Sequence, residues 1–180
     1  MAAGQSKKPQ DRAAPAHAPE PVDLPFDVSV GYQIRATHRA LQRYLQLMIE
    51  PYDVTIGMWY FLRVLWSEDG LTQRELSKRV GLMEPTTLTA ILSMEKKGLV
   101  RRVRDKKDRR RMHVHLTPKG RALQPDLIPL AREVVATAVQ GFSAIETKRL
   151  LASLGQVQQN IQATLAQLDD SETASIGTDE

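Results

Sequence analysis

Hydrophobic residues recur at steps of three and four over most of residues 29–168, the spacing that places them on one face of an α-helix. A first run ends at Pro51, and a second ends at the turn-forming stretch Glu68-Asp69-Gly70. The apolar positions of the two runs are Val30, Ile34, Leu41, Leu45 and Met48, then Ile56, Trp59, Tyr60, Leu62, Leu65 and Trp66. The pattern therefore predicts two amphipathic helices before residue 68.

Polar signals and glycines mark two shorter helices between residues 72 and 98. Thr72 followed three positions later by Glu75 is a capping box, so a helix begins there. Gly81 predicts a tight turn, Pro85 suits the first position of the next helix, and Gly98 ends it. The sequence predicts two helices joined by a short turn.

Beyond Gly98 the pattern changes to alternation. The segments Leu99–Arg104 and Met112–Leu116 alternate enough to be paired strands, and the residues from Asp105 to Asp108 form the tip between them. The sequence therefore predicts a β-hairpin, or wing, directly after the helix pair.

A fifth helix is predicted to begin at Thr117-Pro118. Pro125 and Pro129 lie inside it, and each removes a backbone hydrogen bond. We therefore expect a bend or a break between Leu123 and Leu130.

A second capping box, made by Ser143 and Glu146, begins a sixth helix. Its apolar stripe consists of Leu150, Leu154, Val157, Ile161, Leu165 and Leu168. This stripe is too long to be left in water, and a second copy of the chain would cover it. The alternative is a long helix packed inside a monomer, for which a chain of this size has little other material.

Composition limits the remaining possibilities. Residues 1–28 are rich in Pro and Ala, residues 169–180 are acidic, and we expect both tails to be disordered. Cysteine is absent, which excludes disulfides, thiol redox sensing and thiolate metal sites. We find neither an apolar run of about 20 residues nor the hydrophobic region of a signal peptide, so we expect a cytoplasmic protein without membrane association.

The charge is concentrated in the hairpin. The chain has a net charge of +4 at pH 7, but residues 101–111 contain eight Arg or Lys against two Asp. Such a run is often a solvated surface, yet this density favours a polyanionic partner. A helix pair fits the major groove and a basic hairpin can reach the backbone or the minor groove, so double-stranded DNA is the predicted partner.

Five segments resemble the multiple-antibiotic-resistance regulator (MarR) family of winged helix-turn-helix proteins: Thr55–Leu65, Thr72-Gln73-x-Glu75-Leu76, Lys97-Gly98-Leu99-Val100, Asp108-Arg109-Arg110 and Leu116-Thr117-x-x-Gly120. The resemblance implies a mainly α fold with a small β-hairpin wing (α+β). It also implies a homodimer, a near-palindromic operator, and repression relieved by a small ligand.

The expected domains follow from this resemblance. They are a disordered tail (1–28), an N-terminal dimerisation helix (29–54), a winged helix-turn-helix domain (55–118), C-terminal dimerisation helices (119–168) and an acidic disordered tail (169–180).

The second helix of the pair is the expected recognition helix. Aligned to the family by Gly98, it directs Thr87, Ala90, Ile91 and Met94 to the core and Pro85, Thr86, Leu88, Thr89 and Ser93 nearer the groove. Leu88 also fits the core spacing, and the threonines could be no more than solvated helix surface. Many family members carry a base-reading Arg where this chain has Thr89 or Ala90. We therefore expect contacts to thymine methyls or the shape of the DNA to contribute more to sequence recognition.

In the wing, the resemblance implies that Asp108 orients Arg110 and that the tip enters the minor groove. The candidate DNA-binding residues are Thr72, Gln73, Pro85, Thr86, Thr87, Leu88, Thr89, Ser93, Arg104, Lys106, Lys107, Asp108, Arg109, Arg110 and Arg111.

For the effector, the resemblance implies a site between the first, second and fifth helices. The candidates are Tyr32, Arg35, His38, Arg39, Arg43, Trp59, Tyr60, Arg63 and Trp66. Aromatic walls near arginines suit an aromatic carboxylate or its coenzyme A thioester. His38 is either a satisfied core residue or a ligand contact and pH switch, and both tryptophans are either packing residues or pocket walls.

An enzyme is not expected, and neither is a cofactor. The sequence contains neither a phosphate-binding Gly loop nor His-Glu-x-x-His, and we can place no Ser-His-Asp set. His113 and His115 point the same way from one strand, as a surface metal pair or as a plain strand face toward solvent or DNA. The alternatives to a regulator are an architectural DNA-binding protein without sequence preference and a dimeric module with an acidic protein partner.

Overall fold

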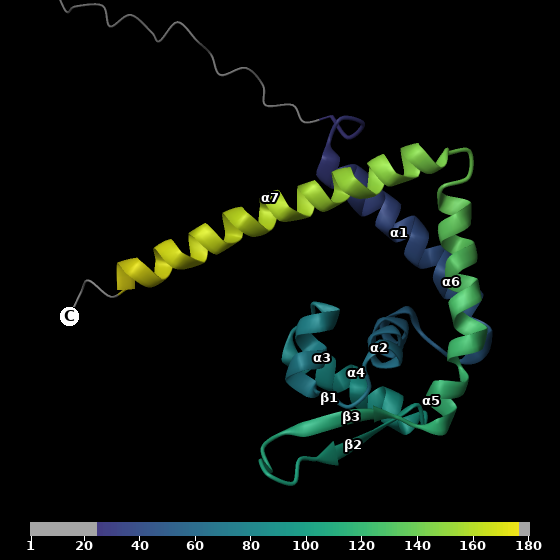
Figure 1. Cartoon of the computed structure of the whole chain (residues 1–180), viewed down its shortest axis with the longest axis vertical. Coiled ribbons are helices and arrows are strands. Elements are labelled where there is room, and N and C mark those ends of the chain that lie inside the picture. Colours follow the sequence, from purple (N-terminus) through teal and green to yellow (C-terminus); the bar gives the residue numbers. More distant parts are fainter. Residues whose placement is uncertain (1–24, 177–180) are drawn as a thin grey trace, which may run out of the picture. The chain divides into compact units, whose positions relative to one another are not determined.

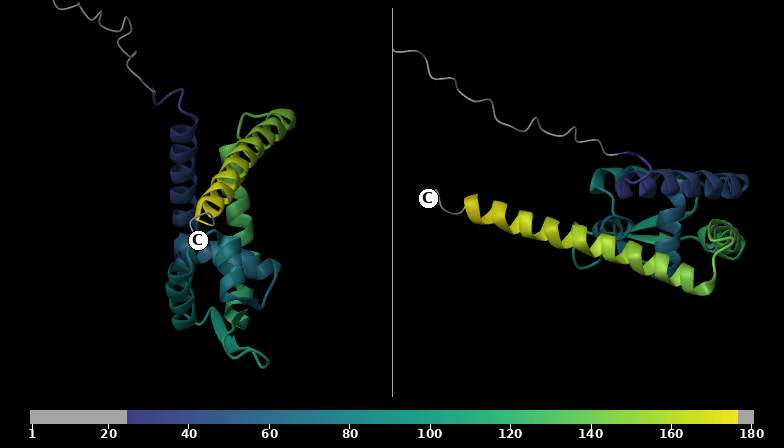
Figure 2. Two further views of the ribbon diagram at one scale, coloured as in Figure 1. Left: turned by 90° about the vertical axis from the view of Figure 1, so that its left-hand side faces the viewer. Right: turned by 90° about the horizontal axis from the view of Figure 1, so that it is seen from above.

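The computed structural model describes residues 25–176, with side chains up to Leu168 (Figures 1 and 2). Its elements are α1 (Val30–Ile49), the 3-10 turn η1 (Glu50–Tyr52), α2 (Ile56–Ser67), β1 (Leu71–Thr72), α3 (Gln73–Val80), α4 (Glu84–Lys96), β2 (Val100–Arg104), β3 (Met112–Leu116), α5 (Pro118–Ala122), α6 (Gln124–Ala138) and α7 (Ala144–Ile176). A mainly helical chain with a small antiparallel sheet confirms the predicted fold class. Residues 1–24 and 177–180 of the two predicted tails lie outside the described residues.

The chain divides into two compact units, one up to Arg39 and one from Ala40 onwards. In the first unit, the ring of Phe26 lies against that of Tyr32, with 4.7 Å between centroids. Gln33 donates a hydrogen bond from Nε2 to the Phe26 carbonyl at 3.2 Å, which ties the turn at residues 26–28 to the start of α1. We find no helix in residues 25–176 that combines the length and the apolar character needed to cross a bilayer.

The sheet has three strands in the order β1-β3-β2, all antiparallel to their neighbours. The hairpin register pairs Val100 with Leu116 and Arg104 with Met112, which confirms that the two alternating segments are paired strands. The third strand, β1, was not predicted. Its two residues are too short to show alternation, and it forms only because Leu71 and Thr72 pair with β3 more than forty residues later.

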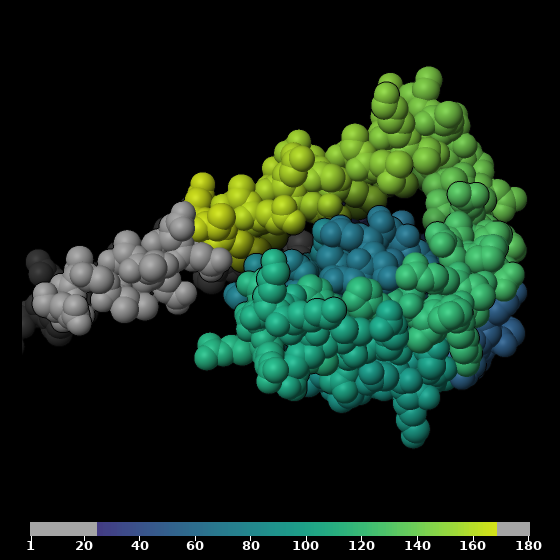
Figure 3. Space-filling model, turned by 60° about the horizontal axis from the view of Figure 1, so that its bottom comes forward, coloured from purple at the N-terminus to yellow at the C-terminus, as the bar shows by residue number. Residues whose placement is uncertain are grey.

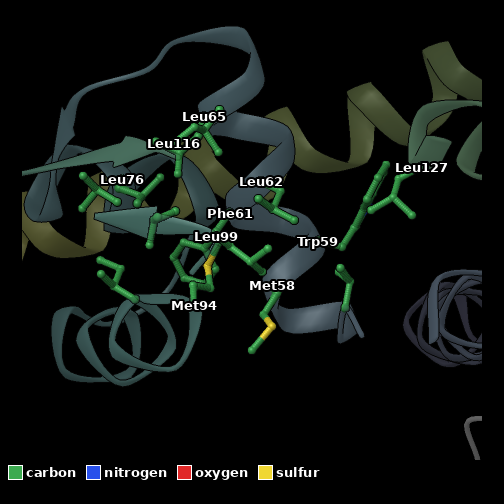
Figure 4. Packing of buried hydrophobic residues seen from close by; sticks show 14 of the residues in the cluster. Met58, Trp59, Phe61, Leu62, Leu65, Leu76, Met94, Leu99, Leu116 and Leu127 are labelled. Atoms are coloured by element: carbon green, nitrogen blue, oxygen red, sulfur yellow. The ribbon is translucent and has the colours of Figure 1, made fainter. Parts of the chain in front are cut away.

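Helix α2 supplies the centre of the core of the second unit. Met58, Phe61, Leu62 and Leu65 belong to one buried cluster with Leu76, Met94, Leu99 and Leu116, in which Phe61 lies beside Leu99 and Leu65 beside Leu116 (Figure 4). On another side of the same helix, Trp59 lies beside Leu127 of α6, and both are at most 2 % exposed (Figure 4). Truncating one such leucine to alanine costs about 2–5 kcal/mol, so the packing on α2 holds the helix pair, the hairpin and α6 together.

A close approach of backbone to backbone joins α5 to the wing. A Cβ atom on Gly120 would lie 2.1 Å from the Leu99 carbonyl oxygen, so only glycine fits. The Gly120 carbonyl accepts a hydrogen bond from Trp66 Nε1 at 2.9 Å. This contact explains why Trp66 is half-buried and serves the packing of α5 on α2.

Most predicted helix ends are confirmed. The Thr72–Glu75 capping box is complete, and so is the one formed by Ser143 and Glu146 at the start of α7. Gly81 adopts a left-handed conformation (φ 74°) at the end of α3. The predicted break in the fifth helix occurs at Leu123, between α5 and α6, while Pro129 is accommodated inside α6.

One predicted boundary is wrong. Figures 1 and 2 show α7 as a single uninterrupted helix, and its backbone runs through residues 169–176, which we expected to be unstructured. The physical reason is local: the sequence has neither Gly nor Pro from residue 156 until Gly177, so nothing stops the helix earlier.

Candidate nucleic-acid interface

The turn between α3 and α4 is tightly bonded. Ser77 is buried, and its hydroxyl donates to the Leu82 carbonyl at 2.5 Å while its own carbonyl accepts from the backbone N–H groups of Gly81 and Leu82. The left-handed Gly81 allows the chain to reverse here without strain. The angle between the two helices is therefore determined by backbone contacts rather than by the exposed side chains.

Three side chains determine which face of α4 points outward. Thr87, Ile91 and Met94 are all 0 % exposed, as the alignment to the family predicted, and Ala90 is half-buried. Thr87 was also among the candidate DNA contacts, and that assignment is wrong because its side chain lies inside the protein. Its hydroxyl has no hydrogen-bond partner among the described residues.

The opposite face of α4 is open to solvent. Pro85, Thr86, Thr89 and Ser93 are exposed there, together with Leu92, and Leu88 lies half-buried at the edge of the core. Four of the predicted groove-facing residues are thus accessible, and the open question about Leu88 resolves to a boundary position.

At the start of α3, Thr72 is a structural residue. It is 9 % exposed, its Oγ1 accepts from the Glu75 N–H at 3.2 Å, and its hydroxyl donates to the Glu75 carboxylate at 2.7 Å. The side chain is therefore held in the cap, and its contact with DNA stays a prediction, since Thr72 also lines the groove beside the wing. The hydrogen bond from the Thr72 hydroxyl, and then one from the Thr72 backbone N–H at 2.8 Å, lower the pKa of the Glu75 carboxyl. Gln73, the next residue, is half-buried and remains available.

The wing tip is organised by Asp105. One carboxylate oxygen accepts from the backbone N–H of Lys107 at 2.7 Å and from that of Asp108 at 2.9 Å, and the other lies 2.9 Å from Nε2 of His113. The backbone hydrogen bonds, with His113 adding to them, lower the pKa of Asp105 to about 2. The tip is thus a bonded turn, which projects beyond the helices in Figure 1 and in the left view of Figure 2.

Most bases of the hairpin lack acidic partners. Arg102 pairs with Glu95 at 2.9 Å and Arg111 with Asp108 at 3.4 Å. Among the described residues, the exposed side chains without an ion pair are Arg101, Arg104, Lys106, Lys107, Arg109 and Arg110. This excess of positive charge leaves the wing suited to a polyanion.

The expected role of Asp108 is only partly present. Its carboxylate accepts from the backbone N–H of Arg110 at 3.0 Å but forms its ion pair with the side chain of Arg111. Asp108 therefore orients the Arg110 backbone and the Arg111 guanidinium, and the Arg110 guanidinium is left unpaired among the described residues.

A groove lies between α3 and the tip end of the wing. It is lined by Gln73, Arg74, Lys78, Glu84, Arg110 and Arg111, among others. Arg74 and Lys78 were not among the predicted DNA-binding residues, although their spacing of four places both on one face of a short helix. Figure 3 shows the helix pair and the hairpin, coloured teal to green, as one adjoining surface. Cations from two elements therefore line one groove.

The two histidines of β3 do not form a plain strand face toward solvent or DNA. His113 is half-buried, with Nδ1 2.7 Å from the Gly70 carbonyl oxygen, and His115 Nδ1 lies 3.6 Å from Asp69. They point the same way, as expected, with 6.4 Å between ring centroids. Within the described residues, no three His, Asp or Glu side chains are grouped so that they could hold a metal ion. The pair anchors the loop before β1.

The nine effector candidates are distributed over both units. Tyr32, Arg35, His38 and Arg39 are exposed on the first part of α1 and belong to the first unit. In the second unit Arg43 is exposed, and Tyr60 accepts a hydrogen bond from Gln42 at 3.4 Å.

Trp59 and Arg63 do line a common hollow, together with Ile128, Ala131, Arg132 and Val135 of α6. Arg132 was missed, although it follows Ile128 by one helical turn and its position was readable from the sequence. Trp66 packs edge-to-face on Trp59, with 5.7 Å between centroids, and does not line this hollow.

Comparison with known proteins agrees with this geometry. Residues 54–112 match the model of the MarR family. The HTH-type transcriptional regulator TtmR of Methylorubrum extorquens is 30 % identical over 139 residues, which cover 77 % of this chain and 70 % of that protein.

Solved structures give the same result. A MarR transcriptional regulator from Methanosarcina mazei superposes with a TM-score of 0.70 at 34 % identity, over 75 % of this chain and 97 % of that one. MepR of Staphylococcus aureus, solved in complex with DNA, superposes with a TM-score of 0.70 at 25 % identity, over 73 % and 98 %. The chain belongs to the MarR family and is a DNA-binding transcriptional regulator of the MarR type.

Proposed function

We propose that this protein is a homodimeric repressor that binds a near-palindromic operator and leaves it when a small aromatic acid binds. The observation that carries the proposal is the accessible outer face of α4 beside a wing whose arginines and lysines have few acidic partners among the described residues. In a two-fold dimer, two α4 helices would enter successive major grooves about 10 base pairs apart.

The wing supplies the electrostatic part of this binding. Neutralising phosphates with Arg and Lys releases counterions, so the affinity should fall steeply with salt. Arg110 is the residue best placed to contribute, because its guanidinium is exposed, unpaired within the described residues and next to a turn held by Asp105 and Asp108. An arginine in a narrow minor groove is favoured by the strongly negative potential there.

The dimer is supported by α7. Its exposed large apolar side chains include Ile145, Leu150, Leu151, Leu154, Ile161 and Leu165. Leaving so many in water on one helix is unfavourable, at roughly 25 cal/mol for each Å² of apolar surface that a partner would bury. The start of α1 exposes Val30, Tyr32 and Ile34 as well. We assign residues 29–54 and 119–168 to dimerisation, and residues 55–118 to DNA binding.

The effector site that we propose is the hollow between α2 and α6. Trp59 offers an aromatic wall, and Arg63 and Arg132 offer two cations at its rim. A planar carboxylate accepts a bidentate hydrogen bond from a guanidinium, so an aromatic acid or its coenzyme A thioester matches this lining.

A selection experiment tests the proposal. The full chain would be used to enrich duplexes from a random DNA pool, and its affinity for an enriched duplex would be compared with that for a scrambled one at physiological salt. We expect a palindromic consensus and a preference of at least about 10³-fold. Equal affinities would favour the architectural alternative instead. Transcription from a promoter that carries the enriched site should fall when the protein is added and recover with the effector.

A further inference from the structure

The outward face of the recognition helix carries almost no charge. Pro85, Thr89, Leu92 and Lys96 follow one another at steps of four, three and four, so they share one face of α4. Only Lys96, at the far end, is charged. Within residues 85–95 there is no Arg, Lys, Asn or Gln, the side chains that read guanine or adenine through paired hydrogen bonds.

The hydroxyl of Thr89 is already engaged. It donates to the Pro85 carbonyl one turn earlier, with 3.1 Å between the oxygens. A hydroxyl has a single donor, so this threonine offers DNA its γ-methyl group and an acceptor oxygen but no proton. The residue that stands at the centre of the outward face is therefore chemically closer to valine than to serine.

The neighbouring side chains are apolar and exposed. Leu92 is 44 % exposed, and Met83, at the N-cap of α4, is 76 % exposed. The major groove presents hydrogen-bonding groups at every base pair but only one apolar group, the C5 methyl of thymine. An apolar helix face in that groove finds its complement where thymines lie.

Given the operator binding proposed above, on which this inference rests, we propose that α4 reads thymine methyl groups through Thr89 and Leu92 as the main source of base specificity. The wing and the groove between α3 and the hairpin supply affinity without reading the bases of the major groove. The operator half-site should accordingly carry thymines at the positions that α4 covers.

Uracil provides the test, since it pairs like thymine and lacks only the C5 methyl. An enriched duplex would be remade with deoxyuridine at the thymines of the half-site centre, and binding of the full chain would be measured. We expect affinity to fall about fourfold for each contacted methyl, the value of one buried methylene-sized group. Deoxyuridine in the flanks beneath the wing is the matched control and should change nothing, because the methyl faces the major groove.

Two variants of one residue locate the contact. Thr89→Val keeps the methyl contact and should retain the discrimination between the thymine and the deoxyuridine duplex. Thr89→Ser removes the methyl, should bind it about fourfold more weakly, and should lose part of its discrimination against deoxyuridine. Residue 89 is exposed, so neither change threatens the fold.

The opposite results would overturn the inference. Equal binding of the thymine and deoxyuridine duplexes would do so, and so would a loss with Thr89→Val but not with Thr89→Ser, which would indicate reading by the hydroxyl. An unchanged deoxyuridine effect in both Thr89→Ser and Leu92→Ala would assign the effect to DNA shape. A failure of the proposed function would give a different result, because the native chain would then show no preference for the enriched duplex.

Discussion

Glu95, near the end of the recognition helix, holds Arg102 of the wing by two hydrogen bonds. One carboxylate oxygen accepts from the Arg102 backbone N–H at 3.1 Å, and the other accepts from its Nε at 2.9 Å. Both side chains are about one-third exposed or less, so the pair is shielded from full hydration. Because α4 faces the major groove in our proposal and β2 leads to the wing tip, this contact sets the spacing between the two DNA-binding elements.

We expect Glu95→Ala to weaken operator binding although residue 95 does not touch DNA. The change leaves the Arg102 N–H and guanidinium without their acceptors, which should lower the free energy of unfolding by about 1–3 kcal/mol. Urea unfolding measures the stability and fluorescence anisotropy the affinity. Glu95→Gln, which keeps an acceptor oxygen, should lose less of both, and equal losses would contradict a positional role.

Arg110→Ala should reduce operator affinity at least about tenfold, with the slope of log affinity against log salt reduced by about one. The reason is the loss of an unpaired guanidinium at the wing tip. Salt-dependent binding curves provide the measurement, and sedimentation should report an unchanged assembly. Unaltered affinity would remove Arg110 from the interface.

The wing tip should respond to pH through His113. Hydrogen bonding to the Gly70 carbonyl, then to Asp105, raises the pKa of His113, and Glu75 acts in the same direction. Both ring nitrogens donate only in the imidazolium form, so the protonated ring satisfies both partners at once. A raised folded-state pKa means stability that is present below the ordinary value of 6.5 and is lost as the pH rises through the folded value.

Asp105 affects the stability of the wing tip at low pH. Its pKa of about 2 lies below the ordinary value of 3.8, so its contribution is present above 3.8 and lost as the pH falls through about 2. We therefore expect the tip to be most ordered between these limits, near pH 4–6.5. Titration of His113 by NMR in the native chain and in Asp105→Asn checks this, and the variant should show the lower pKa of His113. Identical titrations would refute the coupling.

Gly120→Ala should destabilise the protein by about 1–3 kcal/mol or more, because the new methyl would meet the Leu99 carbonyl oxygen. Gly57→Ala is the matched control: its Cβ would have only Thr55 Oγ1 nearby, at 3.9 Å, and the change should be neutral or stabilising. Thermal unfolding of the two variants gives the comparison, and equal midpoints would contradict the close approach.

Ile161→Asp combined with Leu165→Asp should produce folded monomers. Both residues are more than half exposed in the single chain, so two carboxylates cost its fold little, whereas burying them against a second copy is unfavourable. Sedimentation and circular dichroism measure assembly and fold. Gln159→Asp, on the opposite side of α7, should leave the dimer intact, and a double variant that still sediments as a dimer would rule out this face.

The local parts of the structure were readable from the chain alone. Capping boxes at Thr72 and Ser143, the turn at Gly81 and the break near Pro125 depend on residues within a few positions of one another, so their geometry is encoded locally. The hairpin and its surplus of cations were predictable for the same reason. These features sufficed for the fold class and for double-stranded DNA as the partner.

Contacts between distant residues depended on the tertiary structure. It alone decided that Asp108 pairs with Arg111, that His113 bonds to a carbonyl 43 positions away, and that Leu71 and Thr72 form a strand. Sequence spacing specifies the face of an element on which a side chain lies, but not which element packs on that face. That choice depends on how α2 buries its apolar surface against α3, α4, the sheet and α6 at the same time. Because this packing involves segments that are distant in the sequence, no short stretch of the chain predicts it.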